Sequence, residues 1–188
     1  MAGRAVALVL VGAGLTVGCS SGDDVSPSGP DVTVAPSDDV PVDSATPTVP
    51  ADFVADIRPA IDAVEAELGG PQQYFEVTAN GRFVNVFVAV DDATAAVPYL
   101  YVDGDLQPPA PAQEGASGNT FAATDLDFDE ATLLDRVADE LPNTQIEALS
   151  VYGDGVGATY VVGGRSSVGG MLDIVITSDG AVVSVDPI

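Results

Sequence analysis

The sequence predicts an α+β fold: two pseudo-repeated units, each a helix followed by an antiparallel meander, form one domain with the helices packed on one face of the sheet. Two stretches have apolar residues at helical spacing, and short apolar runs separated by glycine turns follow each one. Corresponding features lie at similar intervals in the two halves, about 51–106 and 120–188. Each unit alone would leave its apolar faces uncovered, whereas two together bury them.

The N-terminus has the pattern of a signal peptide over residues 1–18. Met1 to Arg4 is a short positive start, and an uncharged apolar run of 13 residues, Ala5 to Val17, follows it. A helix needs about 20 apolar residues to cross the hydrocarbon core, so this run is too short for a membrane span.

The chain's one cysteine follows this run directly. The sequence Leu15-Thr16-Val17-Gly18-Cys19 resembles the bacterial lipobox, although the family usually has leucine where Thr16 stands. The resemblance implies acylation of Cys19 and attachment to the extracytoplasmic face of the cell membrane, where two or three acyl chains hold a protein firmly. The alternative is a free or buried thiol after an ordinary secretory signal.

Residues 19–50 are expected to be the lipidated cysteine and a disordered tether. Ser20 to Pro50 contain six prolines, six serines, six aspartates and no basic residue. Proline removes backbone donors and the aspartates repel one another, so an extended chain is favoured. Scattered valines leave a docked strand as the alternative.

The domain, residues 51–188, is expected to begin with a helix that ends at Gly69-Gly70-Pro71. Pro59 implies either a kink or a true helix start near Arg58. Strands are expected over 74–78, 82–90 and 97–102, with a hairpin at Asn80-Gly81 and a turn at Asp103-Gly104. The apolar stripe of the helix consists of Phe53, Ile57, Ile61, Val64 and Leu68.

The second half begins after a loop over 107–118. A short strand is expected over 120–124, and then a helix entry in which Asp127 and Glu130 form a capping box. This helix should bury Leu133, Leu134, Val137 and Leu141 and end at Pro142-Asn143. The expected strands after it are 145–152, 158–162, 170–177 and 181–186, with turns at 153–155, 163–165 and 178–180.

Two intervals support an internal duplication. From the helix-ending leucine to the first hairpin glycine there are 13 residues in the first half and 14 in the second. From that glycine to the Asp-Gly turn there are 23 and 25. Chance spacing in an α+β chain rich in glycine turns is the alternative. The residues compared are Leu68, Gly81 and Gly104 with Leu141, Gly155 and Gly180.

The composition excludes several classes of function. The chain has 29 acidic residues against five arginines, a formal charge of −24, no histidine and one cysteine. Histidine-based catalysis and His or Cys zinc sites are excluded, and no cofactor is expected. The negative charge disfavours nucleic acid as a partner. The acid excess and lack of lysine fit a high-GC bacterial or a haloarchaeal source.

Asp125, Asp127 and Asp129 are weak candidates for a metal site. They occupy positions one, three and five of a calcium-loop pattern, but Glu130 and Arg136 stand where that loop needs glycine and glutamate. A looser calcium site, also drawing on 91–92, is the alternative to a helix cap and turn.

Other candidate motifs are weaker. Gly153, Gly155 and Gly157 fit a hairpin better than a nucleotide loop, and 164–167 is expected to be a mobile loop rather than a nucleophile site. The many carboxylates leave a glycoside hydrolase open without indicating any pair. Five tyrosines in predicted strands would form a recognition surface if they face outward, or pack in the core: Tyr74, Tyr99, Tyr101, Tyr152 and Tyr160.

A family resemblance rests on two stretches, 121–137 and the meander that closes with 174–183. Together they resemble uncharacterised actinobacterial lipoproteins with tandem PepSY-like or β-lactamase-inhibitor-like α+β repeats. The resemblance implies a non-enzymatic envelope domain that binds a protein or peptide through its sheet face or loops. A lipoprotein that binds a small ligand or a divalent cation is the alternative.

Overall fold

The structure, a computed structural model, describes residues 53–188. The predicted signal peptide, Cys19 and the tether lie outside the described residues. The helical segments are η1 (Phe53–Asp56), α1 (Ile57–Leu68), η2 (Ala123–Asp125) and α2 (Leu133–Glu140). The strands are β1 (Gln73–Asn80), β2 (Val84–Val90), β3 (Ala95–Val102), β4 (Asp105–Leu106), β5 (Gln113–Glu114), β6 (Phe121–Ala122), β7 (Thr144–Gly153), β8 (Ala158–Ser166), β9 (Met171–Ile176) and β10 (Val182–Pro187).

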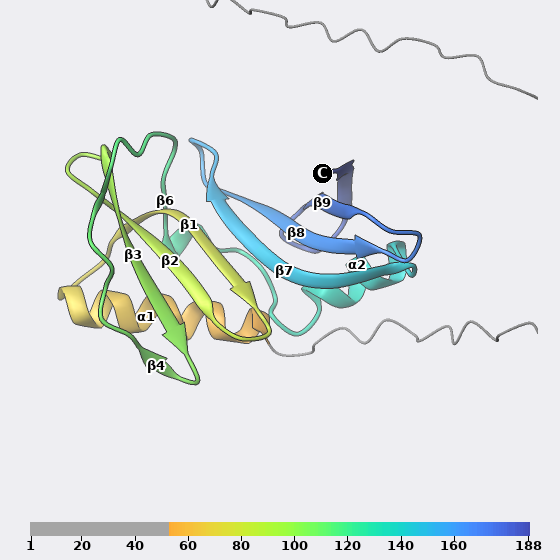
Figure 1. Cartoon of the computed structure of the whole chain (residues 1–188), viewed down its shortest axis with the longest axis horizontal. Coiled ribbons are helices and arrows are strands. Elements are labelled where there is room, and N and C mark those ends of the chain that lie inside the picture. Colours follow the sequence, from red (N-terminus) through yellow and green to blue (C-terminus); the bar gives the residue numbers. More distant parts are fainter. Residues whose placement is uncertain (1–52) are drawn as a thin grey trace, which may run out of the picture. The chain divides into compact units, whose positions relative to one another are not determined.

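All ten described strands belong to one antiparallel sheet, so the predicted α+β class is confirmed. The strand order is β10-β9-β8-β7-β1-β2-β3-β4, and the short strands β5 and β6 pair with β3 and β1. Each helix precedes its own meander, and the two meanders meet where β1 pairs with β7 (Figure 1). None of the helices among the described residues is long and apolar enough to span a membrane.

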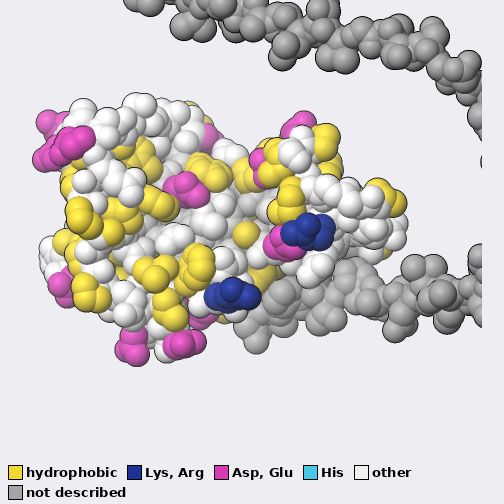
Figure 2. All heavy atoms as spheres, viewed as in Figure 1, with side chains coloured by type: hydrophobic (Ala, Val, Ile, Leu, Met, Phe, Trp, Pro, Cys, Tyr) yellow, Lys and Arg dark blue, Asp and Glu magenta, His cyan; other side chains and the backbone are white. Residues whose placement is uncertain are grey.

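The helices lie behind the sheet in Figure 1, so the viewer faces the side that the helices leave uncovered. We call this side the open face. Figure 2 shows hydrophobic side chains gathered on it over β1–β3, with acidic side chains among them. The open face therefore offers apolar surface over these strands.

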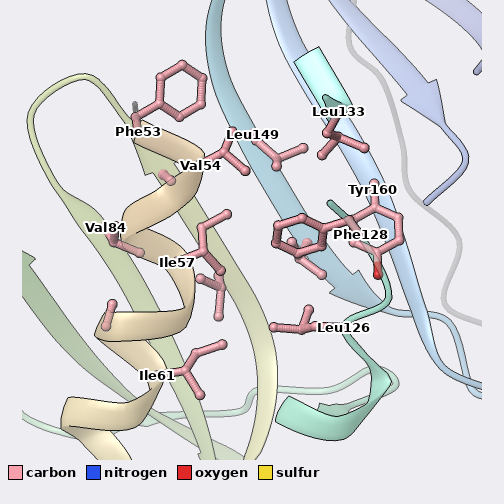
Figure 3. Packing of buried hydrophobic residues seen from close by; sticks show 14 of the residues in the cluster. Phe53, Val54, Ile57, Ile61, Val84, Leu126, Phe128, Leu133, Leu149 and Tyr160 are labelled. Carbon is pink, nitrogen blue, oxygen red and sulfur yellow. The ribbon is translucent and has the colours of Figure 1, made fainter. Parts of the chain in front are cut away.

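The core lies between the sheet and its helices (Figure 3). Because side chains alternate along a strand, the directly paired Val77 of β1 and Val151 of β7 share the helix side, and both are fully buried. One continuous cluster includes buried residues from both helices and from β1, β2, β7, β8 and β9. The two halves therefore bury a single core, as one domain requires.

The first helix largely follows the predicted pattern. A 3₁₀ turn precedes α1, which begins at Ile57 with Pro59 in its first turn, so the predicted start near Arg58 is confirmed rather than a kink. Gly69 ends the helix in the left-handed conformation, with φ 80°. One detail of the stripe is wrong: Leu68, the last residue of α1, is 43% exposed.

The capping box predicted for Asp127 and Glu130 is wrong. The helix α2 begins only after Thr132, whose side chain makes no cap bond. Instead, Asp129 Oδ1 accepts hydrogen bonds from the backbone N–H groups of Ala131 and Thr132, at 2.9 and 3.2 Å. The acceptor thus lies two residues further along the chain than predicted.

Tertiary packing explains this shift. The ring of Phe128 is buried edge-on against Tyr160, with 5.6 Å between the ring centroids. The backbone N–H of Asp127 donates to Tyr160 Oη at 3.0 Å. This segment is therefore held in an irregular conformation by β8, and the helix starts later.

A turn predicted at 163–165 is also wrong, because β8 continues through both glycines to Ser166. Gly164 is buried, and a Cβ there would lie 2.6 Å from Thr144 Cγ2. The glycine thus permits a close approach within the sheet instead of a turn. The hairpin turn follows β8, where Gly169 and Gly170 have positive φ.

Candidate functional site

A pocket of about 340 Å³ lies on the open face, at the end of the sheet where β1 begins and β7 ends. We call it the open-face pocket. Strand residues of β1, β2, β3 and β7 form its floor, and the loop before β6 forms its rim. Its lining residues are Phe75, Glu76, Phe87, Ala96, Ala116, Ser117, Gly118, Asn119, Tyr152 and Gly153.

A β-bulge in β1 places two consecutive side chains in this pocket. Tyr74 pairs with Val88 and Glu76 with Phe87, so Phe75 is the extra residue. Bulges redirect side chains, and here both Phe75 and Glu76 line the pocket while Tyr74 stays in the core.

Tight packing against the β7–β8 hairpin holds the rim of the pocket in place. A Cβ on Gly153 would lie 2.5 Å from the carbonyl carbon of Thr120 and 2.7 Å from the carbonyl oxygen of Asn119. The Asn119 side chain in turn lies against Gly155, with Oδ1 3.2 Å from the place of a Cβ. The rim loop is therefore fixed by contacts that only glycine allows.

A short chain of hydroxyl groups orients the carboxylate of the pocket. Thr78 Oγ1 donates to Glu76 Oε1 at 2.5 Å. Because a hydroxyl has one proton, the 2.7 Å contact between Thr78 and Ser150 must then have Ser150 as its donor. The Glu76 carboxylate is thus oriented by Thr78, its neighbour on the same face of β1.

Tyr152 keeps its proton in this setting. Burial raises the pKa of the Tyr152 hydroxyl, and the nearby carboxylate of Glu76 raises it further. The neutral ring therefore presents an aromatic face and a hydroxyl next to the only charged side chain among the lining residues.

Two of the three aspartates proposed as a weak metal site make local hydrogen bonds to the backbone. Asp125 Oδ2 accepts the backbone N–H of Ala122 at 2.8 Å, and Asp129 holds the turn before α2. The Asp127 carboxylate accepts no hydrogen bond from the described residues. Within 53–188, no three His, Cys, Asp or Glu side chains gather closely enough to hold a metal ion.

The remaining candidate motifs lie in hairpins and strands. Asp91 and Asp92 form the β2–β3 turn with positive φ. Asp154 caps the β7–β8 turn, accepting the N–H groups of Val156 and Gly157 at 2.8 Å. Most of 164–167 lies in β8, so the mobile loop expected there is wrong; Arg165 pairs with Glu147 across the sheet, with 2.9 Å between Nε and Oε1.

The five tyrosines divide between the core and the surface. Tyr74, Tyr99 and Tyr160 are buried, and Tyr101 is half-buried against the core. Tyr152, at 37% exposure, is the tyrosine of this set that lines the open-face pocket. Most of these tyrosines therefore pack in or against the core, whereas Tyr152 faces outward.

Sequence reasoning did not identify Phe75, Glu76 or Phe87 as site residues. The signal present was the adjacent pair Tyr74-Phe75, which interrupts the alternation of β1. Such a break is consistent with a bulge, but it does not show which strands will flank it.

Comparisons with known proteins give one likeness. No protein-family profile matches the chain, and no curated protein matches it. A crystal structure of a candidate lipoprotein from Clostridium difficile 630 matches it with a TM-score of 0.53 and 14% sequence identity, over 69% of this chain and 90% of the other. At this identity the likeness concerns the fold. The comparisons give no support for the PepSY-like or β-lactamase-inhibitor-like resemblance.

Proposed function

We propose that this chain is a lipoprotein anchored through acylated Cys19 at the extracytoplasmic face of the cell membrane, and that its domain binds a protein or peptide without catalysis. The anchor is supported by the lipobox-like sequence around the chain's one cysteine. It is also supported by the shared fold with a protein described as a candidate lipoprotein. The observation that favours binding is the aromatic-lined pocket on the open face.

Replacement of the anchor residue tests the first half of this proposal. Cys19→Ser removes the thiol that would carry the acyl chains, so the protein should move from the membrane fraction to the soluble fraction and lose incorporation of a fatty-acid analogue. Ser20→Ala is the matched control and should stay in the membrane fraction. If Cys19→Ser stays membrane-bound and the wild type takes up no label, the lipoprotein proposal is wrong.

Crosslinking on intact cells tests the second half. A binding module should capture one defined partner reproducibly, and excess purified partner should compete for the crosslink. Recovery of only random neighbours counts against the proposal. Turnover on a broad panel of glycosides and esters would contradict the proposed absence of catalysis.

The volume of the open-face pocket favours a second candidate, a lipoprotein that binds a small ligand or a divalent cation. Calcium titration with thermal melting tests the cation version. A ligand at a hundredfold excess over its dissociation constant adds about 2.7 kcal/mol to the free energy of unfolding. An unchanged melting temperature at constant ionic strength counts against calcium.

We also propose that the two halves arose by duplication of one helix-plus-meander unit, and that the chain belongs with the PepSY-like or β-lactamase-inhibitor-like repeat proteins. The order of α1 before β1–β3 and of α2 before β7–β10 supports the duplication. Close relatives should then show residue identity between matching positions of the halves. Identity no better than between unrelated α+β units would contradict it.

A further inference from the structure

We propose that the open-face pocket receives a lysine or arginine side chain of the partner. This inference rests on the proposed binding function and specifies its chemistry. It follows from four features of the pocket: its size, the arrangement of its rings and carboxylate, its charge, and the composition of the tether.

The size of the pocket suits one inserted side chain. Its volume of about 340 Å³ is near the lower end of the roughly 300–1,000 Å³ that is usual for ligand pockets. The rim loop over 116–119 borders one side of it, so the pocket is an open depression in which a side chain can lie against the strands.

The register of the sheet places the carboxylate between two aromatic rings. Glu76 is the direct cross-strand partner of Phe87 on β2 and of Tyr152 on β7. Directly opposed side chains start about 4.5–5.5 Å apart at Cβ, so both rings flank the carboxylate. The bulge adds Phe75 as a third ring.

Aromatic faces and a carboxylate together select a cation. The electron-rich face of a ring attracts ammonium and guanidinium groups, and a carboxylate accepts their hydrogen bonds. An anion would meet the negative charge of Glu76, and a purely apolar group would leave the charge of this carboxylate uncompensated, since Thr78 supplies it only with a neutral hydroxyl donor. A basic side chain satisfies both the rings and the carboxylate.

No basic residue of the described chain competes for this site. No lysine or arginine lines the pocket. Arg58, Arg136 and Arg165 form ion pairs elsewhere, with Glu130, with Glu140 and Asp179, and with Glu147. The excess of acids over the whole chain also attracts cationic partners at longer range.

The chain's own tether does not supply the occupant. Ser20 to Pro50 contain no lysine or arginine, so docking of this segment would bring no cation. Among the described residues of a second copy, Arg82, in the β1–β2 turn, is the one arginine that forms no ion pair. Self-association is therefore a separate outcome of the test below.

Amide NMR on the isotopically labelled full chain tests the inference. The probes are three blocked pentapeptides, Ser-Gly-X-Gly-Ser, in which X is arginine, lysine or neutral citrulline. The arginine and lysine peptides should shift the amide signals of 75–76, 116–119 and 152–153, and citrulline should bind at least tenfold more weakly. Equal binding of citrulline, or shifts confined to other regions, overturns the inference.

Variants separate the pocket from the general negative field. Glu76→Gln and Tyr152→Leu should each weaken arginine-peptide binding about tenfold or more, whereas Tyr152→Phe keeps the ring and should stay within about threefold. Asp62→Asn, which removes the same charge from the exposed side of α1, should have no effect. Equal weakening by Asp62→Asn overturns the inference, and well-dispersed amide spectra verify that each variant folds.

Crosslinking on cells distinguishes failure of this inference from failure of the proposed function. If wild type captures a defined partner and Glu76→Gln does not, the inference is supported. If both capture it equally, the partner binds elsewhere and the inference fails while the binding function stands. If neither captures a partner, the proposed function itself fails. If the protein forms dimers that dissociate when Arg82 is changed to Ala, the occupant of the pocket is a second copy of the chain. The proposal of a foreign partner is then wrong.

Discussion

At the scale of single residues, Gly153 has the clearest structural requirement. A methyl group there would lie 2.5 Å from the carbonyl carbon of Thr120, so Gly153→Ala forces the rim loop to move. We expect a loss of about 1–3 kcal/mol in the free energy of unfolding. Gly157→Ala is the matched control, since a Cβ there meets nothing within 4 Å. Urea denaturation measures both, and equal midpoints would show that the loop is not packed as described.

Asp179 should make the stability of the domain depend on pH in the acid range. The hydroxyl of Thr177 donates to the Asp179 carboxylate, and together with Arg136 it lowers the pKa of this carboxyl below its usual range. A lowered folded-state pKa means that the stabilisation is present above the unfolded pKa, about 3.9, and is lost as pH falls through the folded value. The stability difference between wild type and Asp179→Asn should therefore be largest near neutral pH and shrink toward zero in acid.

The measurement is urea denaturation of both proteins from pH 7 down to the acid limit of folding. Ser178→Ala, in the same turn, is the control and should show no such dependence. A difference that grows as pH falls has the opposite sign and would contradict the assigned contacts.

At the scale of elements, two residues can be compared as the cap of α2: Asp129, which the structure shows, and Asp127, which the sequence pattern predicts. Asp129→Ala removes the acceptor for the N–H groups of Ala131 and Thr132 and should cost about 1 kcal/mol. Asp127→Ala, the cap that the sequence pattern favours, should be nearly neutral. Thermal or urea unfolding compares the two, and a larger loss for Asp127→Ala would restore the capping box.

The same elements show how far sequence reasoning reaches. Both helices and the hairpin at Asn80 were predictable, because periodicity and turn residues act over a few neighbouring positions. The late start of α2 depends on Phe128 packing against β8, and the role of Gly164 depends on Thr144 of β7. Such contacts link distant parts of the chain and leave no local pattern. The pocket was missed for the same reason, since Glu76 becomes a site residue only through its neighbours on β2 and β7.

At the scale of the whole molecule, Arg58 links the two halves. From α1 it donates to the carbonyl oxygen of Leu126 at 3.1 Å, pairs with Glu130 at 3.0 Å and lies 5.1 Å from the ring centroid of Phe128. Arg58→Lys keeps the charge but loses the planar fork, so we expect a loss of about 1 kcal/mol. Arg82→Lys is the control. Equal unfolding free energies for the two variants would mean that this link contributes nothing measurable.

The large negative charge of the chain should make its thermal stability depend on salt. With 29 acids and five arginines, repulsion between carboxylates outweighs the few ion pairs, and those found within residues 53–188 are all solvent-accessible. Salt screens both the repulsion between carboxylates and the attraction within ion pairs, with a screening length of about 10 Å at 0.1 M. Because the repulsion is larger, the net effect of added salt should be to stabilise the fold. The melting temperature of the full chain should therefore rise by several degrees between 10 mM and 0.5 M NaCl. Sucrose at equal osmolarity is the control for excluded-solute effects. A melting temperature that falls with NaCl would mean that the ion pairs outweigh the repulsion.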